Sequence, residues 1–236
     1  MKKISILLLY TLLISPLSLS AKSYTFSGGK NNLIHSIAAE VLIKAYKKAD
    51  IEITPLYLTL QESLERSNAG ETDGELARIS TITRFTPNLD KVPVSIISVE
   101  AVAFSKNTSL VINNWNDLRG HKITIVKGVK FIETETKGLE RNFVATHQDA
   151  LQLLQLDQTE VIVIPKLASI NLIYQNKYHD IKAVSNSLKS PELYHFVHRK
   201  NRHLIPIITP ILQEMKNSGE IEFIRKAELM KAAKKF

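Results

Sequence analysis

The feature that most constrains the fold is a repeated alternation of short apolar segments with amphipathic ones from Tyr24 onward. A strand predicted over Ser23–Phe26 leads into a helix whose apolar residues recur at helical spacing between residues 33 and 45. In the second half, the unbroken apolar run Val161–Ile164 is typical of a strand covered on both faces, and a helix is expected to follow it. Alternating strands and helices predict an α/β fold with mainly parallel strand pairing. Because the two blocks are similar in size and order, we expect two lobes.

Three further elements can be predicted from local pattern. Ile51–Leu58 reads as a strand that contains a proline, which is typical of an edge or irregular position. Val92–Phe104 is one long β-rich stretch. A helix is predicted to follow Gly128 and to continue through about Leu139.

The N-terminal segment has the pattern of a secretory signal peptide. Lys2 and Lys3 precede an uncharged run, and Pro16 and the small residues of Ser18–Ala21 close it. An uncleaved membrane anchor is the alternative, but the uncharged run only just reaches spanning length and a proline interrupts it. We therefore expect residues 1–21 to be removed and the mature protein to be exported and soluble. No cysteine follows, so no lipid anchor through an N-terminal cysteine is expected.

Composition argues against several classes of function. The chain has no cysteine, which excludes thiolate catalysis, cysteine-ligated zinc and disulfides. Its seven histidines are dispersed, and no nucleophile elbow, zinc-protease motif or phosphate-binding glycine loop occurs, so neither a metal, a cofactor nor an enzymatic activity is predicted. The formal net charge of +8 comes from scattered residues, so nucleic acid is not an expected partner. The positive balance weakly favours anionic ligands.

Four motifs, in order along the chain, resemble those of the family-3 periplasmic solute-binding proteins. Asn68–Glu75 (NAGETDGE) resembles that family's "NxGExDGE", and Asn116–Gly128 (NDLRGHKITIVKG) looks like its "DLkGkkigvxxG". Phe196–Asn201 (FVHRKN), followed by Leu204, resembles "iaxrKxnxxL", and Ser218–Ile221 (SGEI) is similar to the closing "sGxxxxI". Each motif is weak by itself, but four in register are fairly specific.

The resemblance implies the two-lobed type II periplasmic-binding fold, with a ligand cleft between lobes joined by two hinge strands. Residues 22–104 and 189–236 would form lobe one, and residues 105–188 would form lobe two. A small-molecule ligand would be trapped in the cleft, where the carboxyl ends of strands and the N-termini of helices meet. The partner would be an inner-membrane transporter or sensor, and the protein is expected to be a monomer.

In lobe one the candidate ligand-binding residues are Ser27, Gly28 and two arginines. Ser27 and Gly28 follow the first strand and precede a helix, so they either face the cleft, cap the helix, or do both. Arg78 ends a predicted strand, and alternation places Glu75 on the opposite face. The resemblance implies that Arg78 or Arg84 holds a ligand carboxylate through its bidentate fork, and the sequence leaves both open, together with a plain surface salt bridge.

In lobe two the candidates are Gly128 and Val129, where a strand passes into a helix and glycine allows close approach of the backbone. Val129 stands where many members of the family carry Thr or Ser, so it offers only its N–H. Pro165 stands where amino-acid-binding members have an Asp for the ligand ammonium, and Glu62 stands where related chains often have Arg. An ordinary α-amino acid is therefore not the expected ligand.

The leading hypothesis is a periplasmic solute-binding protein that captures a small polar or anionic solute for a transporter. Two alternatives remain open from the sequence. One is a ligand-sensing accessory protein that reports to a signalling partner. The other is a secreted lyase or hydrolase on the same fold, which rests on fold analogy alone.

Overall fold

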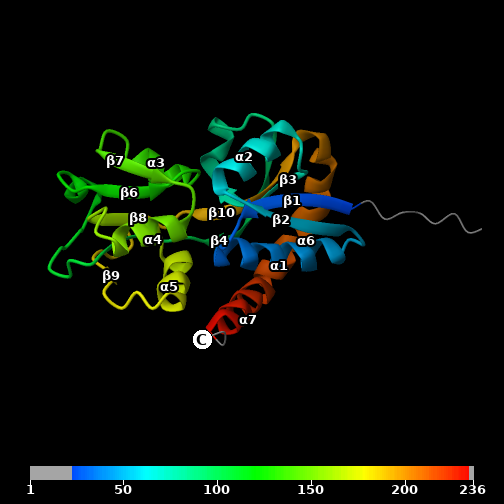
Figure 1. The fold of residues 1–236 in the computed structure, drawn as a ribbon. Coiled ribbons are helices and arrows are strands. Elements are labelled where there is room, and N and C mark those ends of the chain that lie inside the picture. Colours follow the sequence, from blue (N-terminus) through cyan, green and yellow to red (C-terminus); the bar gives the residue numbers. More distant parts are fainter. Residues whose placement is uncertain (1–22, 234–236) are drawn as a thin grey trace, which may run out of the picture.

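The computed structural model describes residues 23–233, and the predicted signal peptide lies outside them. The chain forms two five-stranded sheets, each covered by helices (Figure 1). The first sheet has the strand order β2-β1-β3-β10-β4. Its strands are β1 (Ser23–Gly29), β2 (Glu52–Leu58), β3 (Gly74–Ile79), β4 (Leu89–Ser98) and β10 (Glu192–His198). Its helices are α1 (Leu33–Lys47), α2 (Leu60–Ala69), α6 (Ile205–Asn217) and α7 (Glu220–Ala233), with 3-10 turns at Ser80–Arg84 and Arg199–Leu204.

The second sheet has the order β7-β6-β8-β5-β9. Its strands are β5 (Ala101–Ser105), β6 (Ile123–Val126), β7 (Arg141–Val144), β8 (Val161–Pro165) and β9 (Lys182–Ala183). Helices α3 (Lys130–Glu135), α4 (His147–Gln155) and α5 (Lys166–Gln175) and a 3-10 turn at Trp115–Leu118 complete this lobe. The apolar run of β8 is fully buried, as expected of a central strand.

The expectation of mainly parallel pairing is wrong. Among the described strands β1 pairs in parallel with β2 and β3, and β6 with β7 and β8. The pairings of β10 with β3 and β4, and of β5 with β8 and β9, are antiparallel. The antiparallel strands are those that carry the chain between the lobes. They enter each sheet from the opposite direction to the strands of the β-α-β units.

The two crossings between the lobes lie side by side. The predicted stretch Val92–Phe104 is divided into β4, which belongs to the first sheet, and β5, which belongs to the second. The chain thus changes sheets before Phe104, where the resemblance placed the lobe boundary. The amides of Val99 and Ala101 donate to the carbonyls of Pro191 (3.1 Å) and Lys189 (2.9 Å) on the returning segment. Within residues 23–233 these paired segments are the only covalent links between the two sheets.

Other elements follow local sequence rules. β2, which contains Pro55, is an edge strand as predicted. Asn32 caps α1 by accepting from the Ile34 amide, and Gly70 ends α2 in the left-handed conformation (φ 79°). α3 is shorter than predicted: it ends at Glu135, and Gly138 has left-handed φ before the expected end at Leu139. Within residues 23–233 no helix has the length and apolarity needed to cross a membrane.

Candidate functional site

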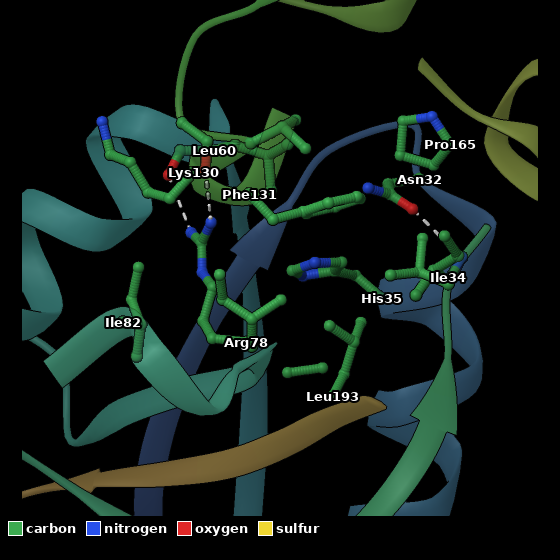
Figure 2. A pocket seen from close by; sticks show the side chains of 15 residues that line it. Asn32, Ile34, His35, Leu60, Arg78, Ile82, Lys130, Phe131, Pro165 and Leu193 are labelled. Atoms are coloured by element: carbon green, nitrogen blue, oxygen red, sulfur yellow. Dashed lines mark hydrogen bonds between the residues drawn. The ribbon is translucent and has the colours of Figure 1, made fainter. Parts of the chain in front are cut away.

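A small cavity of about 50 Å³ lies between the two lobes. Helix and strand ends of the first lobe form one wall, and the turn before α3 with the end of β8 forms the other. In Figure 2 the rings of His35 and Phe131 extend into the space between Arg78 and Pro165. The residues that line the cavity are mostly apolar: Asn32, Ile34, His35, Leu60, Ala77, Arg78, Ile79, Ile82, Val99, Gly128, Val129, Lys130, Phe131, Pro165 and Leu193.

A β-bulge in β3 determines how the charged groups of this site are arranged. Arg78 pairs with Tyr194 of β10 and Glu75 pairs with Phe196, so three steps along β3 match two steps along its partner. The extra residue reverses the alternation of side chains between these two positions. Glu75 and Arg78 therefore share a face and form a salt bridge, with 2.9 Å between Nε and Oε2. The expectation that Glu75 points away from Arg78 is wrong for this reason.

The Glu75–Arg78 pair is buried and almost completely hydrogen-bonded. Arg78 is 6% exposed and Glu75 is fully buried. Besides its Nε bond, Arg78 donates from Nη2 to Glu75 Oε1 (3.2 Å) and to the Leu60 carbonyl (2.7 Å). The hydroxyls of Ser63 and Ser67 donate to Glu75 Oε1 at 2.9 and 3.0 Å. α2 thus supplies most of the polar environment that a buried ion pair requires.

The same pair rests on a buried aromatic network. Tyr46 donates its hydroxyl proton to Nε2 of His195 (2.9 Å), and Nδ1 of His195 donates to the Glu75 carbonyl (2.8 Å). Burial lowers the pKa of His195 to about 4, so the ring is neutral near pH 7. The ring of Phe26 meets His195 edge to face with 4.6 Å between centroids. This network fixes the backbone of β3 beside the bulge.

The two lobes contact each other directly through polar groups and through backbone. Arg78 Nη1 donates to the carbonyl of Gly128 across the cleft at 3.2 Å. Lys130 Nζ donates to Gln61 Oε1 of the first lobe at 3.2 Å and to Glu133 Oε2 of its own helix at 2.8 Å. Gly128 has φ +95°, and a Cβ there would come within 2.6 Å of the Gln61 backbone nitrogen. Glycine is therefore required at this contact, both because its φ is positive and because any Cβ would clash with the backbone of α2.

His35 is a cleft residue to which the sequence did not point. Its Nδ1 accepts from the Gly29 amide at 2.9 Å, which leaves the ring proton on Nε2. Burial, together with the positive charge of Arg78, lowers the pKa of His35 well below its usual value. The ring therefore lines the cavity as a neutral donor. Lys130 and Phe131 also line it, and their position immediately after the predicted Gly128 turn was the available signal.

The structure brings together only some of the predicted site residues. Arg78, Gly128 and Val129 line the cavity. Ser27 is fully buried inside the lobe, because β1 continues to Gly29, and its Oγ lies 3.1 Å from the hydroxyl oxygen of Thr72. Gly28 packs against the ring of His35 and is not part of the cavity wall.

Arg84 is exposed at the end of a 3-10 turn and is not among the lining residues, and no hydrogen bond or ion pair joins its side chain to another described residue. Pro165 does line the cavity, whereas Glu62 lies exposed on α2 beside Arg66. Contact of any of these residues with a ligand stays a prediction.

No protein-family model matches the chain, and no curated protein matches it in sequence. Solved structures do match. A histidine kinase sensor domain described as similar to periplasmic binding proteins superposes with a TM-score of 0.79 at 17% identity, covering 89% of this chain and 96% of the other. An arginine-bound substrate-binding protein of an amino-acid ABC transporter, AbpA from Streptococcus pneumoniae, gives 0.73 at 12% identity, covering 89% and 95%. The GluR0 ligand-binding core in complex with L-glutamate gives 0.74 at 16% identity, covering 89% and 99%.

These likenesses cover nearly the whole length of both chains in each comparison, at low sequence identity. They show that the chain has the two-lobed type II periplasmic-binding fold. The fold predicted from the four motifs is confirmed.

Proposed function

We propose that this chain is a solute-binding protein whose two lobes close on a small molecule held between them. The observation that carries the proposal is the cavity whose wall is shared by both lobes, with Arg78 on one side and Gly128 on the other. Two short crossings at residues 99–101 and 189–191 join the lobes. Such a connection permits one lobe to rotate against the other, as in hinge closure around a ligand.

The proposal includes export to the periplasm, supported by the basic and apolar N-terminal segment, and delivery of the solute to an inner-membrane transporter. The amino-acid ABC transporter proteins among the structural neighbours support this reading. Residue by residue, we propose that Arg78, Gly128 and Val129 contact the solute, together with His35 and Phe131. The neighbours are binding proteins and a sensor domain, so they give no support to a lyase or hydrolase.

A second candidate is a sensor that reports occupancy of the cleft to a signalling partner. It is favoured by the likeness to a histidine kinase sensor domain, of which this chain covers 96%. Recovery of membrane partners from cells that carry an affinity-tagged chain separates the two candidates. A transporter permease supports the first candidate, and a kinase or other signalling receptor supports the second.

The binding function is tested by a solute screen that uses thermal stabilisation as its readout, followed by small-angle scattering on each hit. We expect a stabilising solute that is recovered chemically unchanged and that alters the radius of gyration by moving the lobes. Turnover of the solute would point to an enzyme. Saturable binding with no change in radius and no dependence on Arg78 or Gly128 would contradict cleft closure.

A further inference from the structure

The cations that line the cleft cavity each have a carboxylate partner within the protein. Among the described lining residues only Arg78 and Lys130 carry a positive charge. Arg78 pairs with Glu75 at 2.9 Å, and Lys130 pairs with Glu133 at 2.8 Å. The ring of His35 is neutral. The charged groups around the cavity therefore sum to zero, although the chain as a whole carries +8.

Arg78 also has little capacity left for a ligand carboxylate. Of its five N–H groups, four already donate, two to Glu75 and one each to the carbonyls of Leu60 and Gly128. A bidentate contact with a ligand carboxylate would have to displace Glu75 from Nε and Nη2, or displace the carbonyls of Leu60 and Gly128 from Nη2 and Nη1. Displacement of Glu75 would leave its charge buried, with only the hydroxyls of Ser63 and Ser67 as partners. That arrangement is costly for a fully buried carboxylate.

We propose that Glu75 is a specificity-determining residue: together with Glu133 it neutralises the cleft, so that the site selects uncharged solutes and rejects free carboxylates. This inference rests on the proposed binding function and names its ligand class. It replaces the expectation that Arg78 anchors an anionic ligand. The negative charge of Glu75 would repel a ligand carboxylate, and such a repulsive group is one way in which proteins discriminate against a wrong ligand.

The other residues of the cavity wall indicate which chemical groups a matching solute would have. Most of it is apolar, with Ile34, Leu60, Ile82, Phe131 and Leu193 around the cavity. The polar groups available to a solute include the donors Nε2 of His35, Nδ2 of Asn32 and Nη1 of Arg78, and Nη1 regains an N–H when the lobes part from Gly128. A matching solute has an apolar body and a neutral acceptor such as an amide or ketone oxygen. A cavity of about 50 Å³ is far below the roughly 300 Å³ of ordinary ligand pockets, so the lobes must open to admit it.

Benzoate and benzamide provide a matched pair of probes, because they share an apolar ring and differ in the charge of one group. Titration calorimetry would compare wild type with Glu75→Gln, which keeps the shape of the side chain and frees the charge of Arg78. We expect wild type to prefer benzamide, and Glu75→Gln to shift the benzoate-to-benzamide affinity ratio at least tenfold towards benzoate. Ser67→Ala is the control, since it removes a hydrogen bond to Glu75 without removing the negative charge.

Because Glu75 is buried, Glu133→Gln provides a second variant at a partly exposed position, where it frees the charge of Lys130. It should shift the ratio in the same direction. Benzoate binding to wild type at least as tightly as benzamide would overturn the inference, and so would no gain of benzoate affinity in either glutamine variant. The proposed function fails by a different result, in which no solute of the screen stabilises the protein or changes its radius. If the wild-type protein closes on a carboxylate, the binding function is supported and the proposed preference for uncharged solutes is contradicted.

Discussion

Arg78 and Arg84 lie in opposite environments, although the sequence left both open as the residue that holds a ligand carboxylate. Arg78 is buried against Glu75, whereas Arg84 is exposed and has no partner among the described residues. Removal of one member of a buried ion pair leaves the other charge uncompensated, which typically costs about 3–5 kcal/mol. Surface substitutions usually change stability by less than about 0.5 kcal/mol.

Arg78→Ala is therefore expected to lower the free energy of unfolding by roughly 3–5 kcal/mol. Arg84→Ala is expected to leave it unchanged. Urea denaturation followed by far-ultraviolet circular dichroism measures both. Equal losses in the two variants would show that the Glu75–Arg78 pair contributes no more than an exposed side chain.

His195 couples the stability of the first lobe to pH. Burial, which outweighs the hydrogen bond to the Glu75 carbonyl, lowers the pKa of His195 from 6.5 to about 4. The unfolded chain therefore takes up this proton at a higher pH than the folded chain does. The resulting stabilisation is fully present above pH 6.5 and is lost as the pH falls towards 4. A shift of this size corresponds to roughly 3 kcal/mol.

His195→Gln should flatten the pH dependence of the free energy of unfolding between pH 6.5 and pH 4. It should also lower stability at pH 7, because a less complementary side chain then fills the site between Phe26 and Tyr46. His147, whose pKa is likewise lowered by burial to about 4, keeps part of the slope in this variant. Urea denaturation of both proteins at several pH values measures this dependence. If the slope of stability against pH were the same in His195→Gln as in wild type, the assignment of the pH dependence to His195 would be contradicted.

At the scale of elements, most helices and strands could be predicted because their signals are local. Gly70 ends α2 by a backbone conformation that favours glycine, and Pro55 marks an edge strand because it cannot donate to a neighbour. The apolar run of β8 likewise indicated a central strand. These residues act through their own backbone or their own burial, so no knowledge of distant partners was needed.

The features that the sequence did not reveal depend on distant partners. The bulge in β3 falls at Leu76 and Ala77, which carry no glycine or proline signal, and it exists only relative to β10. The division of Val92–Phe104 likewise depends on pairing with the returning segment near Lys189. Apolar residues predominate on both sides of the crossing within this stretch, so hydrophobic pattern alone does not locate the change of sheet.

The same distinction explains the candidate site. Arg78, Gly128 and Val129 could be predicted because residues at the ends of strands meet at one edge of a sheet. Ser27 could not be placed correctly, because the sequence signal for the end of β1 came three residues too early. The salt bridge between Arg78 and Glu75 depends on the bulge. Because of it, we infer that the cleft takes uncharged solutes and not the anionic ones that the sequence suggested.

At the scale of the whole molecule, one backbone contact between the lobes leaves no room for a side chain. Gly128 packs on the start of α2, where an added Cβ would lie 2.6 Å from the Gln61 nitrogen and 2.7 Å from the Leu60 carbonyl carbon. These are backbone atoms, so the clash cannot be relieved by rotation of a side chain. Separation of the lobes relieves it, and this also breaks the hydrogen bond from Arg78 to the Gly128 carbonyl.

Gly128→Ala is therefore expected to shift the protein towards a more open arrangement, with weaker binding of any solute that requires closure. Gly138→Ala is the matched control: Gly138 has a similar left-handed φ of +85°, but no other atom lies within 4 Å of an added Cβ. The control carries the same backbone strain, of about 1–2 kcal/mol, without the contact between lobes.

Because the chain has no cysteine, Glu65→Cys and Lys137→Cys at exposed positions in the two lobes provide unique sites for spin labels. Pulsed electron paramagnetic resonance should show a longer distance between the labels in Gly128→Ala than in wild type or Gly138→Ala. Identical distance distributions in all three proteins would mean that this glycine does not limit closure.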